Sequence, residues 1–289
     1  MAELHKGLIM SKQFINFNGD IVPADQQILT VANRGFRYGD GLFESMRWMN
    51  GELKFAELHS ERIRKGLKLL KMDSWSHVDS WFIREKIEEL VRRNRTGQDA
   101  RIRLTTYRDG EGLYSPGSNK MGFILEASQL KESSYTFNDK GLMIDVYDEL
   151  TKPINVLSNL KTCNSLVYVL AGIFKNQNSL DEVIILNNNG FLCESMSSNA
   201  FIVYDRKLYT PALNEGCIAG VMRQVIIKLA KENGLEMVEA QINPDILNEA
   251  DEVFLTNAAK GIQWVMGYNN KRYFCEVSRF LQEKLNLLK

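Results

Sequence analysis

The sequence is poor in the residues that build metal centres and disulfide scaffolds. Only four cysteines and three histidines occur among its 289 residues. The cysteines are widely spaced, with no Cys-x-x-Cys pair and no histidine at metal-ligand spacing; they are Cys163, Cys193, Cys217 and Cys275. This pattern argues against a structural zinc site and against a disulfide framework. We therefore expect no metal, and thiols that are reduced and buried.

A net charge and long apolar runs are missing as well. The chain has 36 Lys plus Arg and 36 Asp plus Glu, so nothing in its overall charge calls for nucleic acid or an anionic membrane. No apolar run approaches the length that crosses a bilayer, and residues 1–10 include Glu3, His5 and Lys6 in place of the apolar core of a signal peptide. We expect a cytoplasmic protein that acts on a small molecule, with no nucleic-acid and no membrane partner.

Turn signals and apolar periodicity predict the first half of the fold. Asn18-Gly19 and Asn50-Gly51 are typical of hairpin turns. Apolar residues at helical spacing predict helices over 58–70 and 78–93, and strands are expected over 101–107 and 121–126. The polar segment 128–140 is the best candidate for a linker. We therefore expect a smaller N-terminal α/β domain of residues 1–127, the linker 128–140, and a larger C-terminal domain of residues 141–289.

The second half mixes helices and strands. Strands are expected over 142–146, 183–186, 201–204 and 253–255, and helices over 166–175, 221–231 and 276–288, with Gly234 ending the second of these helices. The order lacks the βαβ rhythm of a dinucleotide-binding fold, and Gly39-x-Gly41 lacks the third glycine of its fingerprint. The expected fold class is α+β, and a nicotinamide site is rejected.

Lys161 and Glu194 suggest a specific chemistry. A lysine that enters a largely apolar pocket loses proton affinity through desolvation, so its amine becomes a nucleophile that can form a Schiff base with an aldehyde such as pyridoxal phosphate. Glu194, in the polar run 193–201, could then keep the pyridine nitrogen of that cofactor protonated. Alone, the pairing is weak, because most lysines are solvated surface residues.

A glycine turn offers a site for an anion. Gly216 and Gly220 bracket a turn that opens into the helix expected over 221–231, so the amides of Val221 and Met222 should point at a bound anion. The alternative is a plain helix N-terminus that binds only water.

Six segments occur in an order that resembles the class IV aminotransferase family. They are 33–45, 59–62, 158–166, 193–201, 218–223 and 255–259, and the resemblance extends from about Phe17 to Val265. It implies the two-domain pyridoxal-phosphate fold type IV, which is D-amino-acid aminotransferase-like, the cofactor pyridoxal 5'-phosphate, and a homodimer.

The resemblance also implies roles for individual residues. The catalytic set is Lys161, Ser45 and Glu194. The cofactor would be bound by Arg62, Lys161, Glu194, Ile218, Gly220, Val221, Met222, Thr256 and Asn257, and the substrate by Tyr38, Phe43, Arg103, Arg108 and Ala258. Met222 departs from the family, whose transaminases usually have a threonine there.

Three reactions remain open within the family: branched-chain aminotransfer, D-amino-acid aminotransfer and 4-amino-4-deoxychorismate lysis. Ser45 stands where lyases tend to have threonine, and Thr256-Asn257-Ala258 looks more like the lyase loop. The loop after Arg108, however, lacks the extra arginine of the lyases, which leaves Arg103 and Arg108 as candidates for the substrate carboxylate. The lyase, which releases pyruvate and the folate precursor 4-aminobenzoate, is favoured slightly over an aminotransferase. A non-catalytic cofactor-binding homologue is the third reading.

Overall fold

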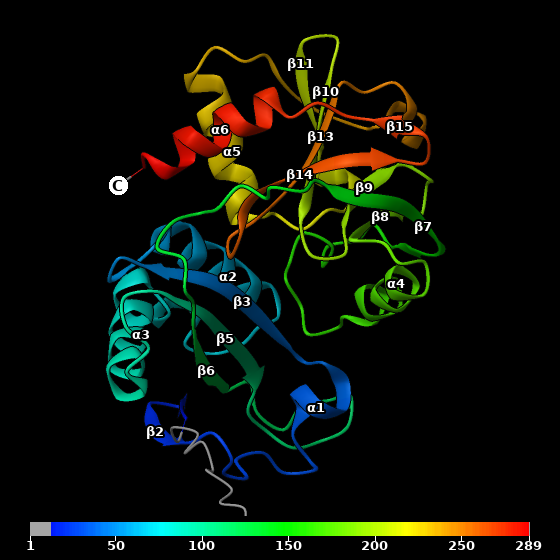
Figure 1. The fold of residues 1–289 in the computed structure, drawn as a ribbon. Coiled ribbons are helices and arrows are strands. Elements are labelled where there is room, and N and C mark those ends of the chain that lie inside the picture. Colours follow the sequence, from blue (N-terminus) through cyan, green and yellow to red (C-terminus); the bar gives the residue numbers. More distant parts are fainter. Residues whose placement is uncertain (1–12, 289) are drawn as a thin grey trace, which may run out of the picture.

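The computed structural model describes residues 13–288, so the expectation for residues 1–10 lies outside it. A first sheet is built entirely from residues 14–129 (Figure 1). Its strands are β1 (Phe14–Phe17), β2 (Asp20–Pro23), β3 (Gly41–Met49), β4 (Glu52–Leu53), β5 (Ala100–Arg108) and β6 (Met121–Gln129), in the order β2-β1-β6-β5-β3-β4. All neighbouring strands are antiparallel. Both predicted hairpin turns are confirmed, with positive φ at the Asn and at the Gly of each pair.

Two helices cover one face of this sheet, and both were predicted. They are α2 (Ala56–Leu69) and α3 (Ser80–Asn94); α1 (Arg34–Tyr38) and a 3-10 turn (Trp75–His77) are shorter. Asp79 caps α3 by accepting from the Phe82 amide at 2.8 Å. Ile83, Ile87 and Leu90 are fully buried at helical spacing, so α3 packs its apolar stripe on the sheet.

A second, nine-stranded sheet forms the rest of the molecule (Figure 1). Its strands are β7 (Leu142–Lys152), β8 (Glu182–Asn187), β9 (Leu192–Ser195), β10 (Asn199–Tyr204), β11 (Lys207–Pro211), β12 (Met237–Ala240), β13 (Glu252–Asn257), β14 (Gly261–Tyr268) and β15 (Lys271–Arg272). The order is β12-β11-β10-β13-β14-β7-β8-β9, with β15 beside β14. The four predicted strands are confirmed as β7, β8, β10 and β13, and β7 runs six residues beyond its predicted end at 146.

Helices connect two of the three parallel pairs of this sheet, the third being β14 with β7. α4 (Leu166–Gln177) links β7 to β8, and α5 (Val221–Glu232) links β11 to β12, because parallel neighbours need a crossover connection. α6 (Glu276–Asn286) packs beside α5. The three predicted helices are therefore confirmed, and Gly234 adopts the positive φ expected just past α5.

The two sheets share no strand, and the chain passes between them in residues 130–141. Strand β6 runs to Gln129, so the first two residues of the predicted linker belong to the sheet; cross-strand pairing with Ala100 and Arg101 holds them there. None of the helices in residues 13–288 is long and apolar enough to cross a membrane. Of the four cysteines, Cys193 and Cys217 are buried as expected, whereas Cys163 and Cys275 are partly exposed.

Two backbone hydrogen bonds join the second half of the chain to the first sheet. The Phe43 amide donates to the Lys161 carbonyl at 2.9 Å, and the Cys163 amide donates to the Gly41 carbonyl at 3.0 Å. Gly41 is also packed closely against β5 and the Lys161 segment, since a Cβ at this position would stand 2.3 Å from the Thr106 carbonyl oxygen and 3.3 Å from Cys163 Sγ. The segment that carries Lys161 therefore runs beside the start of β3.

Candidate active site

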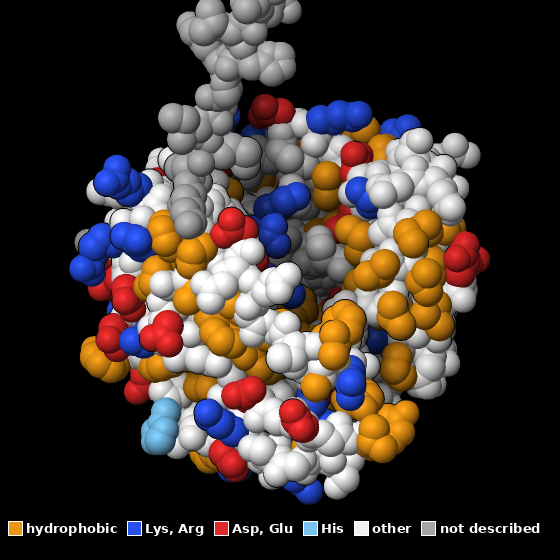
Figure 2. Space-filling model, turned by 90° about the horizontal axis from the view of Figure 1, so that it is seen from below, with side chains coloured by type: hydrophobic (Ala, Val, Ile, Leu, Met, Phe, Trp, Pro, Cys, Tyr) orange, Lys and Arg blue, Asp and Glu red, His pale blue; other side chains and the backbone are white. Residues whose placement is uncertain are grey.

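A cavity of about 730 Å³ lies where the two halves of the chain meet. The face seen in Figure 2 is hollowed, and Lys and Arg side chains lie at the rim of the hollow. Residues of both sheets line the cavity. Those expected from the sequence are Phe43, Ser45, Arg62, Arg103, Lys161, Glu194, Ile218, Gly220, Val221, Met222, Thr256, Asn257 and Ala258.

Strand alternation explains which side chains of the first sheet reach the cavity. Phe43 and Ser45 of β3 point to one face and Glu44 to the other, because successive side chains of a strand alternate. Ser45 pairs with Arg103 of β5, and Arg101 lies two residues before it on the same face. Arg101 lines the cavity too, although the sequence alone did not single it out.

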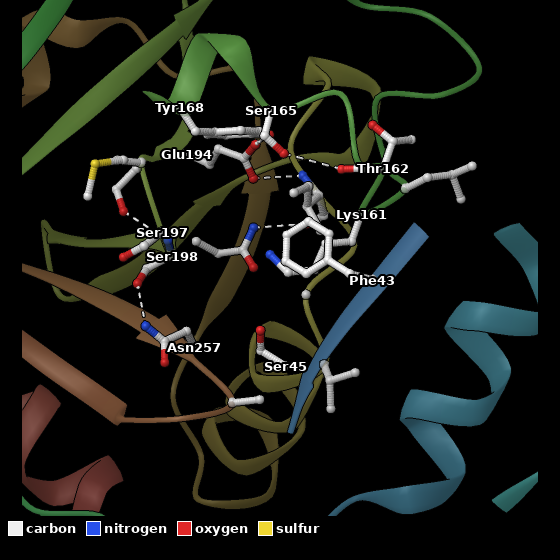
Figure 3. A pocket seen from close by; sticks show the side chains of 18 of the residues that line it. Phe43, Ser45, Lys161, Thr162, Ser165, Tyr168, Glu194, Ser197, Ser198 and Asn257 are labelled. Atoms are coloured by element: carbon white, nitrogen blue, oxygen red, sulfur yellow. Dashed lines mark hydrogen bonds between the residues drawn. The ribbon is translucent and has the colours of Figure 1, made fainter. Parts of the chain in front are cut away.

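Lys161 has a perturbed amine. Its Nζ lies 4.5 Å from the centroid of the Phe43 ring, which fixes the side chain over the aromatic face (Figure 3). Burial is the main reason that the pKa of Lys161 falls to about 8, and the positive charge of Arg62 lowers it further, while Glu44 and Glu194 oppose the shift. A lysine with this pKa has roughly a tenth of its amine unprotonated at pH 7, far more than an ordinary lysine, and only the unprotonated amine acts as a nucleophile or base.

Glu194, on β9, is held by three donors. The Ile218 amide donates to Oε2 at 2.8 Å, and the Tyr168 hydroxyl donates to Oε1 at 2.7 Å. The Lys152 ammonium also donates to Oε1. Glu194 and Lys152 are almost completely buried (Figure 3 shows Glu194 beside Tyr168). The sequence did not indicate Lys152 or Tyr168 as partners of Glu194. Neither residue stands in a recognised motif, and they come from different elements, β7 and α4.

The start of α5 forms a cradle for an anion. The Val221 and Met222 amides have no acceptor within residues 13–288, as expected for a first helical turn. Gly220 is required for close packing at this turn, because a Cβ there would stand 1.9 Å from the amide oxygen of Asn199. The Met222 side chain packs into the core between α5 and the sheet, so only its amide is available to a ligand.

An unpaired hydroxyl faces the same cavity. Thr256 Oγ1 is buried, and no partner for it exists within the described residues. Its neighbour Asn257 donates to Ser198 Oγ at 2.9 Å and accepts from the Ala259 and Lys260 amides, which shapes the loop after β13. Free amides, an orphaned hydroxyl and a nearby guanidinium form the donor set that a phosphate group needs, and this donor set fits the phosphate of the expected cofactor.

Arg62 is positioned by a buried carboxylate. It donates through Nε to Glu44 Oε1 at 2.7 Å and through a second nitrogen to Oε2, and its third nitrogen donates to the Ala219 carbonyl at 3.1 Å. His59 Nδ1 lies 2.6 Å from Glu44 Oε2. Burial raises the pKa of Glu44, but Arg62 and His59 outweigh it and bring the pKa to about 2. Burial lowers the pKa of His59, so Arg62 carries the positive charge of this cluster near neutral pH.

Two expected substrate residues lie elsewhere. Arg108 donates to Asp40, to Asn119 and to the Leu70 carbonyl, so its guanidinium is already paired and does not line the main cavity. Tyr38 lines a separate cavity of about 220 Å³, where Arg34 stacks over its ring. Of the two arginines expected at the substrate carboxylate, Arg103 lines the main cavity and Arg108 does not.

The sequence and the fold of this chain are similar to those of known proteins. Residues 41–267 match the family model described as amino-transferase class IV. A protein of Methanocaldococcus jannaschii, provisionally named a branched-chain-amino-acid aminotransferase, is 30% identical over 93% of this chain and 94% of its own length. The aminodeoxychorismate lyase of Bacillus subtilis is 28% identical over 84% and 83%. The solved structure of the Escherichia coli branched-chain amino acid aminotransferase has a TM-score of 0.84 at 25% identity, covering 94% of this chain and 92% of that one.

The chain belongs to the class IV aminotransferase family. The resemblance of the six segments is thereby confirmed, and with it the α+β fold of type IV, the cofactor pyridoxal 5'-phosphate and the assignment as an enzyme. The comparisons include lyases and aminotransferases, so they leave the reaction open.

The lowered pKa of Lys161 predicts how fast the protein without cofactor captures pyridoxal 5'-phosphate. Only the free amine attacks an aldehyde, so the rate should rise with pH and level off above about 8, well below the ordinary lysine value of 10.5. The visible absorbance of the lysine-bound cofactor measures this rate. A rate that continues to rise to pH 10 would contradict the perturbed pKa.

The buried Glu44 predicts a pH-dependent loss of stability. The pKa of Glu44 in the folded protein is below its ordinary value of 4.5, so its contribution to stability is present above pH 4.5 and is lost as the pH falls towards 2. Glu44→Gln should lower the free energy of unfolding by about 3 kcal/mol at pH 7, with a smaller difference at acid pH. Urea unfolding at several pH values measures both.

Glu57→Gln is the matched control. Glu57 pairs with Arg84 at 2.9 Å, but both side chains are exposed, so this change should cost less than about 1 kcal/mol. Equal losses in the two variants would mean that burial does not strengthen the Glu44 pair.

Proposed function

We propose that this enzyme is a pyridoxal-phosphate-dependent lyase that converts 4-amino-4-deoxychorismate into pyruvate and 4-aminobenzoate. A cytoplasmic location and a role in folate biosynthesis are part of this proposal. The alternative is a branched-chain or D-amino-acid aminotransferase, as several relatives are named.

The charge of the cavity carries the proposal. Arg101 and Lys260 line it, and neither side chain has a salt-bridge or hydrogen-bond partner within residues 13–288. Within the described residues, the one carboxylate near Arg103 is Glu126 at 3.8 Å, and the guanidinium of Arg103 stacks over the Phe43 ring at 4.1 Å. Arg62 and Lys161 are assigned to the cofactor and Lys152 is paired with Glu194, so three cations of the cavity remain for the substrate. This number suits a substrate with two carboxylates, as 4-amino-4-deoxychorismate has, better than leucine or valine, which has one. The amino acceptor 2-oxoglutarate also has two carboxylates, so the paired assay below decides between the two reactions.

The cofactor would be held by the residues that form the cradle. Arg62, the Val221 and Met222 amides and the Thr256 hydroxyl would bind its phosphate, while Ile218 would pack against its ring. When bound, pyridoxal 5'-phosphate supplies an electron sink for the carbanion formed from the substrate. Glu194 would accept a hydrogen bond from the ring nitrogen and so support that role.

The remaining steps belong to side chains of this protein. Once displaced by the substrate amine, the Lys161 amine is free to remove the ring proton beside the substrate nitrogen. Ser45 lines the cavity with Lys161 and offers a hydroxyl that can protonate the departing enolpyruvate. Arg101, Arg103 and Lys260 would orient the two carboxylates, which fixes the bond that breaks.

A paired assay tests the reaction. With 4-amino-4-deoxychorismate we expect pyruvate release, and with leucine, valine or D-alanine plus 2-oxoglutarate we expect little glutamate. Ser45→Ala should lower pyruvate release by roughly 10²–10⁴-fold while the absorbance of the bound cofactor persists. Efficient glutamate formation without pyruvate release from the first substrate would establish the aminotransferase instead.

Arg101→Gln tests the cavity charge directly. It should raise the KM for the two-carboxylate substrate roughly 10–100-fold, as expected for loss of a charge-assisted hydrogen bond, and leave cofactor binding intact. Arg92→Gln, on the exposed surface of α3, is the control and should change neither value. An unaltered KM in Arg101→Gln would remove the argument from charge.

The proposal includes a homodimer. An apolar face on α4 supports it: Leu166, Val169, Leu170 and Ile173 are all at least 42% exposed, and their spacing places them along one side of the helix. Figure 2 shows hydrophobic side chains gathered on the side of the molecule where Figure 1 draws α4. Monomeric proteins rarely expose a contiguous apolar face of this kind, and the family resemblance makes a second copy of the chain its expected partner.

Sedimentation velocity tests the dimer. The protein should sediment as a dimer at micromolar concentration, and Val169→Asp should shift it towards monomer because a buried charge without a partner is costly. Trp81→Asp, at a 70% exposed position on α3, is the matched control and should remain dimeric. A fully active monomer of the unaltered protein would refute the proposal.

A further inference from the structure

Lys152 is a buried cation that the chemistry described so far does not use. It stands at the end of β7 with 6% of its surface exposed, and its ammonium donates to Glu194 Oε1. The same ammonium lies 5.6 Å from the centroid of the Tyr168 ring, whose hydroxyl donates to the same carboxylate oxygen. Lys152 also lines the cavity, so its charge acts close to the ligand.

The three donors divide the two oxygens of Glu194 unequally. Oε1 accepts from Lys152 and Tyr168, whereas Oε2 accepts only from the Ile218 amide. A carboxylate can accept about four hydrogen bonds, so one position remains, and it is on Oε2. Because Lys152 and Tyr168 fill Oε1, Oε2 is the oxygen that remains available to a cofactor nitrogen.

Lys152 provides the only close positive charge paired with this carboxylate within residues 13–288. The other titratable groups around Glu194 are Tyr168, Cys193, Cys217 and Lys161. Burial raises the pKa of Tyr168 and of both thiols, so these three groups are neutral near neutral pH. A protonated ring nitrogen would be a second cation at a carboxylate that Lys152 already neutralises.

We propose that Lys152 is a positioning residue that turns Glu194 Oε2 towards the ring nitrogen of pyridoxal 5'-phosphate and lowers the proton affinity of that nitrogen below the value that Glu194 alone would give. The proposal rests on the proposed role of Glu194. Lys152 has two effects. Its hydrogen bond orients the Glu194 carboxylate, and its positive charge disfavours a second positive charge on the ring nitrogen. The electron sink would thereby be weaker than in a site with an unpaired glutamate.

The test uses the cofactor-loaded enzyme with ¹⁵N in the pyridine ring. The ring nitrogen's chemical shift, followed against pH, gives the pH at which it loses its proton. Lys152→Met should raise this midpoint by about one pH unit or more, because one nearby positive charge is gone. Lys152→Arg keeps the charge and should return the midpoint close to that of the unaltered enzyme.

A purely structural role predicts a different pattern. It would lower the melting temperature of Lys152→Met equally with and without cofactor and leave the nitrogen midpoint unchanged, which would overturn the proposal. On our proposal, the protonated ring replaces the missing cation, so added cofactor should raise the melting temperature of Lys152→Met more than that of the unaltered protein. If Lys152→Met does not fold, Lys152→Gln removes the charge while keeping a hydrogen-bond donor, and the same midpoint shift is expected.

Glu194→Gln separates this proposal from the one on which it rests. If Glu194→Gln leaves the nitrogen midpoint unchanged, Glu194 is not the partner of the ring and the proposed site assignment fails. If Glu194→Gln shifts the midpoint but Lys152→Met and Lys152→Gln do not, the role of Glu194 stands and the role of Lys152 is wrong.

Discussion

The site depends on the two backbone hydrogen bonds that join the segment of Lys161 to the start of β3. They place a residue of the second half of the chain over the Phe43 ring and beside Ser45 of the first sheet. Because backbone bonds are directional, they fix the height of the lysine along the strand as well as its distance from it. Gly41 is needed at the start of β3 because no side chain fits there.

Two buried ion pairs flank the lysine, one from each half of the chain. Glu44 with Arg62 comes from the first, and Lys152 with Glu194 comes from the second. Burying such charges costs free energy unless they are paired and hydrogen-bonded, and both pairs are held by further donors. Arg62 and Glu194 are the residues expected to touch the cofactor. Glu44 holds Arg62 and Lys152 holds Glu194, which limits the rotation of both side chains. Burial and the positive charge of Arg62 lower the pKa of the Lys161 amine, against the opposing charges of Glu44 and Glu194.

The anion cradle and the cations of the cavity differ in origin. The core of the cradle is local: a glycine and the two amides of a first helical turn suffice to suggest it. The cations are assembled from distant places, with Arg101 and Arg103 adjacent on one strand face and Lys260 on a loop some 150 residues later in the chain. The proposed preference for a substrate with two carboxylates therefore comes from the packing of the two sheets.

The sequence by itself determined the elements and the family. The Asn-Gly turns, the apolar stripe of α3 and the helix that begins at Gly220 are local features, because hydrogen bonds and burial within a few residues decide them. Six motifs in order were enough to name the cofactor. The long extension of β7 was missed, since polar residues follow its apolar start and the pairing of Lys152 with Asn187 across the sheet is not a local property.

Only the tertiary structure decided the partners of the charged residues. Arg108 and Arg103 look equivalent in the sequence, yet Arg108 lies beside Asp40 and Asn119 while Arg103 faces the cavity. Lys152 and Tyr168 were found at Glu194 only because β7, α4 and β9 meet there. Electrostatic interactions depend on distance and burial in three dimensions, and neither can be obtained from spacing along the chain.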